Sequence, residues 1–362
     1  MPKESPCFFL GANSPKGFYS KFDQLFNYKD SCRSVLIKGG PGTGKSTVLK
    51  KAAAVLKDKG LSTELIYCTA DTDSLDAVIT ADGAFSMLDA TLPHAVEPKY
   101  PGAYEETLDL STCWDKAVLK NNMAKIITLF DTNRELHAKA RKYIAAAAEL
   151  LDEAARLSAE TLSPEKIANT ASRICAREFG KKRRRPGSEK LRFLSAVTDK
   201  GVTMFRNTPK ILCDKIYVID DDCGAASRIF MNTVRRTALD YGFNIITCRC
   251  GIFPGEKNEH IFIPEIRLGF MTSNRRHPVT EQPYRMIHAK RFSAEKQAGR
   301  AKLRIRFCLR TAAQLLDEAA AFMKEAKTVH DRLEEKYIAA SSSNCADFEK
   351  VGEKTAEFLA TL

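Results

Sequence analysis

A glycine-rich stretch carries the clearest chemistry in the chain. Residues 39–46 read Gly-Gly-Pro-Gly-Thr-Gly-Lys-Ser and match the pattern G-x-x-x-x-G-K-[ST] in full. Glycines let the backbone turn so tightly that successive N–H groups point at one anion, at the positive end of the following helix. The lysine adds a cation for the outer phosphates, and the hydroxyl can ligate Mg²⁺. The pattern therefore predicts a site for nucleotide phosphates.

An acid at the end of a neighbouring strand completes the predicted metal site. Asp89 follows the mostly apolar residues 85–88, an arrangement similar to a Walker B motif, and we expect Asp89 and Ser46 to ligate Mg²⁺. Ala90 follows Asp89, so the glutamate that serves many ATPases as general base is missing. Lys45 and Asp89 are the predicted catalytic residues. The nucleotide, ATP or GTP, should be bound by Gly39, Gly40, Pro41, Gly42, Thr43, Gly44, Lys45, Ser46 and Thr47.

For other polar residues of the first half, the sequence allows two interpretations, a functional role and a structural one. Asp71, Asp73 and Asp76 could position water or support the metal, or they could serve as turn and helix-cap residues. His94 could sense the γ-phosphate through a neutral ring nitrogen, or it could be structural.

Arginines are scarce around the predicted site. Arg33 is the only arginine among residues 1–133, whereas phosphoryl transfer usually needs extra positive charge on the transition state. That charge could come from Arg134 on a later helix or from a partner. It could also come from the second half, through Arg275, Arg276 or Arg285.

Strand-like and helix-like stretches alternate around these residues and predict a parallel α/β sheet. A long helix is expected over 114–157 and a further one over 163–179. Together they predict a helical hairpin appended to the α/β core. The expected strands are 34–38, 63–68, 77–80 and 84–89, with a helix over 46–60.

The same order of segments recurs 182 to 184 residues later, which predicts a duplication. In the second copy, Asp220-Asp221-Asp222 begins the stretch that replaces the glycine-rich loop. Ala226 stands where Lys45 would be, Thr272 replaces Asp89, and His277 corresponds to His94. Three carboxylates facing the phosphate position would repel a nucleotide. The second copy is therefore expected to be structural, regulatory or partner-binding, although the three aspartates could instead bind a metal or act as a Walker B motif of another arrangement.

We accordingly predict three segments: a P-loop NTPase domain over 1–180, a basic linker over 181–190, and a degenerate repeat with its own helical hairpin over 191–362. Residues 1–180 contain 23 basic and 23 acidic side chains, whereas residues 181–362 contain 34 and 22, so the net charge of +12 lies entirely in the second half. This half could bind nucleic acid or a protein partner. Its basic helix residues include Arg300, Lys302, Arg304, Arg306 and Arg310.

Composition excludes several classes of protein. No apolar run approaches the roughly 20 residues that span a bilayer, and the N-terminal apolar patch is too short for a signal peptide. The eleven cysteines are odd in number and include no C-x-x-C pair, so a disulfide framework or a zinc site is not expected. These features favour a cytoplasmic protein with no membrane partner.

Three segments carry a family resemblance: LIKGGPGTGKSTVLKK (36–51), YCTADTDSLDAVI (67–79) and LDATLPHAVEPKYPGAYEE (88–106). Through them the chain resembles a poorly characterised bacterial family of tandem-domain P-loop ATPases, of Firmicutes type. The resemblance implies ATP or GTP binding and hydrolysis, and members often keep a working P-loop in both halves. Here the second loop is degenerate, so one competent Mg-nucleotide site is expected. The alternatives are a small-molecule or nucleotide kinase, and a nucleotide-gated scaffold or nucleic-acid-binding protein with little turnover.

Overall fold

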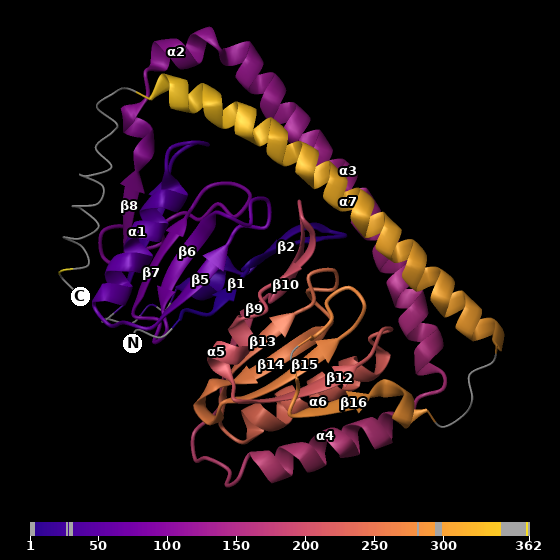
Figure 1. The fold of residues 1–362 in the computed structure, drawn as a ribbon. Helices are drawn as coiled ribbons and strands as arrows, with labels where there is room; N and C mark the ends of the chain where they lie inside the picture. The colour runs from indigo at the N-terminus through magenta and orange to yellow at the C-terminus, as the bar shows by residue number, and fades with distance from the viewer. Residues whose placement is uncertain are drawn as a thin grey trace. The chain divides into compact units, whose positions relative to one another are not determined.

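The computed structural model describes residues 4–26, 28, 32–280, 282–293, 299–341 and 360. The chain forms two compact α/β units, and it enters each of them more than once (Figure 1). The first unit contains Met1–Gly11, Ser20–Ala140 and Ala321–Leu362. The second contains Ala12–Tyr19 and Arg141–Ala320.

A six-stranded sheet with helix α1 (Lys45–Asp58) against it forms the centre of the first unit. The apolar residues of α1 recur at helical spacing and pack against strand side chains that include Ile37, Val78 and Met87. Two short helices, η1 (Phe22–Leu25) and η2 (Leu110–Cys113), also belong to this unit. The strand order is β1 (Cys7–Phe8), β5 (Thr63–Tyr67), β6 (Leu75–Thr80), β7 (Phe85–Asp89), β4 (Arg33–Lys38) and β8 (Glu105–Asp109).

The second unit repeats this sheet strand for strand. Its order is β9 (Ser188–Arg192), β13 (Asn244–Arg249), β14 (Asn258–Ile263), β15 (Leu268–Ser273), β12 (Lys215–Asp220) and β16 (Arg285–His288). Helix α6 (Ala225–Asp240) takes the place of α1, and α5 (Thr208–Leu212), η3 (Pro264–Ile266) and η4 (Ala289–Phe292) complete the unit. Even the irregularity between Ile66 and Tyr67 recurs between Cys248 and Arg249. The predicted two-repeat α/β architecture is therefore confirmed.

The two sheets are mixed rather than parallel as predicted. β6 and β14 run antiparallel to both of their neighbours, whereas the remaining neighbouring pairs are parallel. The connections explain this difference, since residues 68–74 join β5 to β6 and residues 81–84 join β6 to β7. Such links are too short for the helical crossover that parallel neighbours need, which takes about a dozen residues.

The long helices do not form a separate hairpin in each copy, as the sequence led us to expect. After α2 (Lys116–Asn121), helix α3 (Met123–Ala159) packs antiparallel to α7 (Gly299–Ala340). In the first unit the Asn133 side chain donates to the Ala326 carbonyl at 2.8 Å, and in the second the Arg304 guanidinium lies 3.2 Å from Glu153. The predicted terminal helix over 345–360 lies outside the described residues, apart from the helical residue 360.

Helix α4 (Pro164–Glu178) belongs to the second unit rather than to a domain over 1–180. Helix α4 lies beside α6 (Figure 1). Its apolar residues Ile167, Ala171 and Ile174 are buried in the same hydrophobic cluster as the apolar residues of α6. Ser163 starts the helix by accepting the Lys166 N–H. The units are discontinuous along the chain because the apolar face of α4, a helix of the first copy, packs against α6 of the second copy.

The first copy also contributes a hairpin to the second unit. This hairpin is β2 (Gly11–Ser14) with β3 (Gly17–Ser20), and its counterpart is β10 (Ser195–Thr198) with β11 (Gly201–Met204). The Asn13 amide donates to the Val197 carbonyl at 3.1 Å, and the rings of Tyr19 and Phe193 are 6.2 Å apart. A linear boundary near residue 180 therefore does not describe the compact units.

Part of the predicted basic linker, 181–190, is packed rather than solvated. The Arg183 guanidinium lies over the Phe243 ring, and Arg183 and Arg185 both bind the carboxylate of Glu265. Strand β9 begins at Ser188. The positive charge of this segment is thus partly neutralised within the second unit.

None of the helices in the described ranges combines the length and apolar character needed to cross a membrane.

Candidate functional site

The glycine-rich loop, Gly39–Ser46, lies between β4 and α1 as the sequence predicts. Gly42 and Gly44 adopt left-handed backbone conformations, with φ of 68° and 83°. A side chain would be strained at either position, which explains the choice of glycine. The Thr43 hydroxyl donates to the Gly40 carbonyl at 2.8 Å and braces the turn. Gly44 is the N-cap of α1, so the first N–H groups of the helix, which have no acceptor within the helix, lie at the end of the loop.

Lys45 and Asp89 lie together at this end of the sheet. The Lys45 ammonium donates to the carbonyls of Gly39 and Gly40 at 3.1 and 2.9 Å, and it lies 3.6 Å from the Asp89 carboxylate. Both side chains are largely buried, with exposed fractions of 14% and 13%. Thr91 holds the same carboxylate through its N–H and its hydroxyl, at 2.9 and 2.6 Å. The lysine is thus held against the loop, beside the Asp89 carboxylate.

The other predicted binding residues differ in their surroundings. The Ser46 hydroxyl accepts the Leu75 N–H at 3.0 Å, which joins the start of α1 to β6. This bond leaves the oxygen a further lone pair for a metal. Thr47 is exposed on α1. Ser46 and Asp89 suit Mg²⁺, which uses few protein oxygens and completes its shell with phosphates and water. No cluster of three or more His, Cys, Asp or Glu suited to a metal occurs in the part of the chain that the structure describes.

Asp76 and His94 form a buried pair beside this lysine and acid. Asp76 Oδ2 lies 3.3 Å from His94 Nε2, and His94 Nδ1 lies 2.8 Å from the Thr91 carbonyl. Burial lowers the pKa of His94 to about 4, so the ring is neutral at pH 7 and its Nδ1–H donates to the carbonyl. Burial and the nearby Asp89 charge raise the pKa of Asp76 well above its ordinary value. The Asp76 carboxyl and the His94 ring thus face each other within this buried pair.

Asp71 acts as a turn residue, one of the two readings that its sequence position allowed. Its carboxylate accepts the Asp73 N–H at 3.1 Å and the Ser74 hydroxyl at 2.8 Å. It also lies 3.9 Å from the ammonium of Lys327, which belongs to α7. Arg134, one of the predicted sources of positive charge, is exposed and pairs with Asp131 on its own helix at 3.0 Å.

The end of α7 touches the glycine-rich loop, a contact that no sequence pattern predicted. A Cβ on Gly42 would lie 3.0 Å from the Glu334 carbonyl and from the Ile338 side chain. A Cβ on Gly40 would lie 3.0 Å from the Trp114 ring and 3.1 Å from the Tyr337 ring. The α7 residues concerned lie almost 300 positions from Gly40 and Gly42 along the chain, and no local pattern links them.

The corresponding loop of the second unit contains a carboxylate of its own. Asp221 is buried, and its oxygens accept the N–H groups of Gly224 at 3.0 Å and Ser227 at 2.8 Å. Gly224 has φ of 81° and begins α6 as Gly44 begins α1, so Ala225 rather than the predicted Ala226 occupies the place of Lys45. The anion-binding donors at this helix start are thus already used within the chain.

The three aspartates do not all face the phosphate position, contrary to our expectation. Asp220 lies 2.9 Å from His288, and Asp222 accepts from the N–H and the guanidinium of Arg275 at 3.0 and 3.1 Å. Only Asp221 turns into the loop. Because their carboxylates have separate partners, they do not form a shared metal site.

Strand register supports the remaining correspondences between the copies. Thr272 pairs with Ile219 just as Asp89 pairs with Ile37, so threonine does replace the acid. Glu259 and His277, at 3.0 Å, repeat the pair of Asp76 and His94. The Lys257 ammonium also binds Glu259 at 3.0 Å. Burial alone would raise the pKa of Glu259, but His277 and Lys257 hold it well below its ordinary value.

Comparisons with protein-family models, with curated protein sequences and with solved structures gave no match for this chain.

Proposed function

We propose that the first unit binds ATP or GTP with Mg²⁺ at the glycine-rich loop and hydrolyses it, and that the second unit binds no nucleotide. The observation that carries this proposal is the buried Lys45 ammonium, which is held by loop carbonyls 3.6 Å from Asp89. A cation and a carboxylate at the start of a helix, beside a tight glycine loop, are what a Mg-polyphosphate requires. We also propose that the chain is a cytosolic member of the tandem-domain P-loop ATPase family that it resembles.

The residues of the site have separable tasks in this proposal. The backbone N–H groups of Gly40 and of Gly42 to Ser46 bind the phosphates, and Lys45 neutralises charge that develops on the outer ones. Ser46 and Asp89 would hold the metal, which supplies a Lewis acid for the phosphoryl group. Because Ala90 follows Asp89, another group would have to position water, and the buried pair of Asp76 and His94 offers a carboxyl and a ring nitrogen for this task.

A nucleotide-gated switch with little turnover is the second candidate. The observation that favours it is the contact of α7 with the loop, since a helix in that position can respond to whether phosphates are bound. Nothing comparable favours a kinase.

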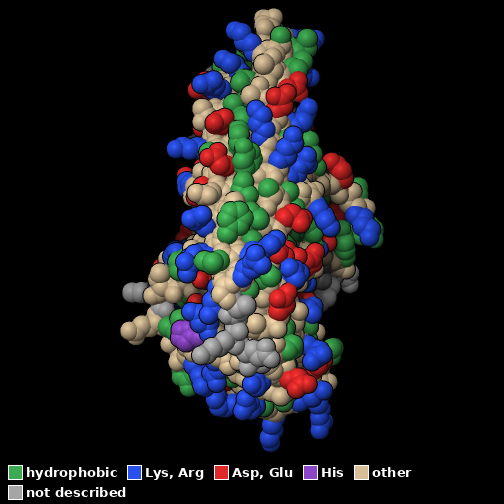
Figure 2. Space-filling view, turned by 90° about the vertical axis from the view of Figure 1, so that its right-hand side faces the viewer, with side chains coloured by type: hydrophobic (Ala, Val, Ile, Leu, Met, Phe, Trp, Pro, Cys, Tyr) green, Lys and Arg blue, Asp and Glu red, His purple; other side chains and the backbone are tan. Residues whose placement is uncertain are grey.

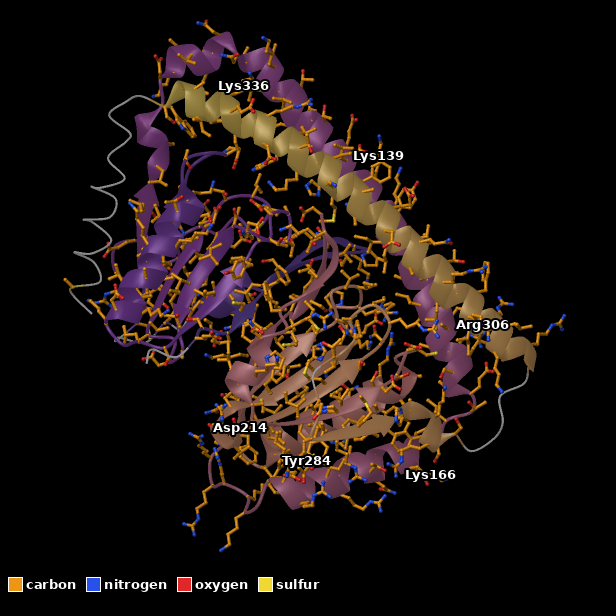
Figure 3. The ribbon with its side chains drawn as sticks, viewed as in Figure 1. Lys139, Lys166, Asp214, Tyr284, Arg306 and Lys336 are labelled. Carbon is orange, nitrogen blue, oxygen red and sulfur yellow. The ribbon has the colours of Figure 1, made fainter. Side chains whose placement is uncertain are left out.

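A nucleic-acid partner remains a proposal that rests on charge. On the face drawn in Figure 2, acidic side chains lie among the lysines and arginines rather than leaving a patch of one sign. Arg306, labelled near the start of α7 in Figure 3, is exposed. We therefore include DNA and RNA as additions in the test below.

The test compares the full chain with its Lys45→Ala variant. We expect Mg-nucleotide binding by calorimetry, weakened about tenfold or more in the variant because a charged hydrogen-bond donor is lost. Phosphate release that depends on Lys45 supports hydrolysis, and stimulation by DNA or RNA supports a nucleic-acid partner. Binding without phosphate release supports the switch. Equal binding by the two proteins, or none by either, would contradict the proposed site.

A further inference from the structure

The basic segment between α4 and β9 is packed closely onto the turn that follows α6. A Cβ on Gly242 would collide with the Arg185 carbonyl, and a Cβ on Gly187 would lie 2.6 Å from a backbone carbonyl of the same turn. The Arg183 N–H donates to the Tyr241 carbonyl at 3.0 Å. These backbone contacts hold the segment in one path across the second unit.

The cationic side chains of this segment have two kinds of surroundings. The guanidinium groups of Arg183 and Arg185 bind the Glu265 carboxylate, and Arg183 also lies over the Phe243 ring. The other cations of the segment are exposed: Lys181, Lys182 and Arg184. Because the segment is already anchored, less conformational entropy is lost when the exposed cations bind a partner.

Helix α4 extends the row of exposed cations. It lies at the edge of the second unit, with α6 on one side of it (Figure 1). The face of α4 that points away from the buried cluster carries three exposed cations: Lys166, Arg173 and Arg177. They extend over about 17 Å of helix axis. Residues 164–187 contain eight basic and two acidic side chains, and one of the acids, Glu178, is paired with Arg177 at 3.0 Å.

An exposed aromatic ring lies beside this row. The Tyr284 side chain, labelled in Figure 3, is 60% exposed, and the Lys215 ammonium lies over its ring, 4.0 Å from the centre. The Tyr284 ring is 5.3 Å from that of Tyr217, whose hydroxyl accepts from the Arg177 guanidinium at 2.6 Å. Tyr284 and the cations of α4 thus meet at Arg177. An aromatic ring beside a row of cations can stack on an unpaired base while the cations bind phosphates.

We propose that these exposed cations of α4 and of residues 181–185, together with Tyr284, form a binding surface for single-stranded nucleic acid. The cations would bind the phosphates without regard to sequence, and Tyr284 would stack on one base. This inference names a surface for a nucleic-acid partner and does not depend on nucleotide binding in the first unit.

The same surface is poorly suited to an anionic membrane. Peripheral binding to a membrane uses large apolar side chains that enter the lipid beside the cations. The large apolar residues of 164–187 are all buried: Ile167, Ile174 and Phe179. Nucleic acid is therefore the polyanion that this surface fits.

The test measures binding of fluorescein-labelled oligo(dT) and oligo(U), each of about 20 nucleotides, to the full chain by fluorescence anisotropy at several salt concentrations. The variant Lys182→Gln/Arg184→Gln is compared with Lys302→Gln/Arg306→Gln, which removes one lysine and one arginine from exposed positions of α7. We expect the first variant to bind about fivefold to tenfold more weakly near 0.1 M salt. Its slope of log K against log salt should be smaller by about 1.4, because each lost phosphate contact removes about 0.7. The α7 variant should bind like the wild type.

Tyr284→Ala tests the aromatic part of the surface separately. It should weaken binding about fivefold or more and leave the salt slope unchanged, because stacking releases no counterions. Tyr100→Ala, at an exposed tyrosine of the first unit, should bind like the wild type.

Three results would overturn the proposal. The first is no binding of either oligonucleotide by the wild type at about 0.05 M salt. The second is an equal loss of affinity in Lys182→Gln/Arg184→Gln and Lys302→Gln/Arg306→Gln, which would assign binding to net charge alone. The third is binding of phosphatidylserine vesicles, but of neither oligonucleotide, that is lost in Lys182→Gln/Arg184→Gln. Lys45→Ala should keep the wild-type affinity for oligonucleotides, so this proposal and the proposed nucleotide site can fail independently.

Discussion

Four ionisable residues of the second unit are buried together near Gly224: Lys257, Glu259, His260 and His277. Charges buried in this way cost several kcal/mol each unless they are paired, and here the Lys257 ammonium and the His277 ring both bind Glu259. The ammonium also lies 3.1 Å from where a Cβ on Gly224 would be. A lysine from the segment before β14 thus brings positive charge to a loop that has lost the counterpart of Lys45.

His260 makes the stability of this unit dependent on pH. The side chain is fully buried, and burial lowers its pKa to about 3. Its Nδ1 accepts the Thr272 N–H, which requires a neutral ring. In the unfolded chain the pKa returns to about 6.5. The neutral histidine therefore contributes full stability above that pH and loses it as the pH falls from 6.5 towards 3.

We expect the free energy of unfolding to fall by about 1.4 kcal/mol per pH unit between pH 6 and 4 because of this one group. His260→Gln keeps an acceptor for the Thr272 N–H but does not titrate, so its slope should be smaller by that amount. Urea unfolding at several pH values measures these slopes, and an unchanged slope in His260→Gln would refute the assignment.

At the scale of elements, α1 and α6 both have glycine as N-cap, but the N–H groups at their starts have different surroundings. The free N–H groups at the start of a helix need acceptors. In α6 the Asp221 carboxylate accepts two such N–H groups, whereas in α1 the loop places the Lys45 ammonium nearby and the end of α7 lies against Gly42. The N–H groups of Gly224 and Ser227 therefore already have an acceptor within the second unit.

Asp221→Asn should destabilise the second unit by about 1–2 kcal/mol, because an amide offers one acceptor for two N–H groups and loses the charge that favours a helix start. Asp240→Asn makes the same chemical change at an exposed position of α6 and should have a much smaller effect. Chemical denaturation would compare the two variants with the wild type. Equal losses of stability in both would show that Asp221 is not a special cap.

At the scale of the whole molecule, the two units share their chain segments. The hairpin β2–β3 and helix α4 come from the first copy but belong to the second unit, and α3 and α7 each contribute to both. A cut at the basic segment between the copies would therefore remove core residues from the second unit, including Ile167, Ala171 and Ile174.

This arrangement predicts how fragments should behave. A fragment of residues 187–362 lacks α4 and exposes the apolar face of α6, so we expect it to aggregate or to unfold without cooperativity. A fragment of residues 160–362 retains α4 and should be recovered in better yield, and co-expression of 1–186 with 187–362 should restore a folded complex. Soluble yield and thermal unfolding by circular dichroism measure this. Cooperative unfolding of 187–362 alone, at the stability of 160–362, would contradict the shared core.

Features encoded by short stretches could be read from the sequence. The strand, glycine-rich loop and helix around Lys45, the Asp89 strand end and the repeat of the whole pattern each depend on local composition and order, which propensity and backbone geometry dictate. The copies could be aligned because each strand and helix kept its apolar pattern. The structure confirms two of the aligned positions. Thr272 pairs with Ile219 as Asp89 pairs with Ile37, and His277 lies beside Glu259 as His94 lies beside Asp76.

Only the tertiary structure decided the rest, because it depends on which distant surfaces bury each other. The direction of β6, the packing of α4 on α6, and Asp221 turning into its own loop arise from contacts that no local pattern specifies. The same holds for the contact of Glu334 with Gly42, residues almost 300 positions apart. The sequence by itself determined the glycine-rich loop between a strand and a helix in the first unit, whereas the packing of α7 decided which distant residues lie against that loop.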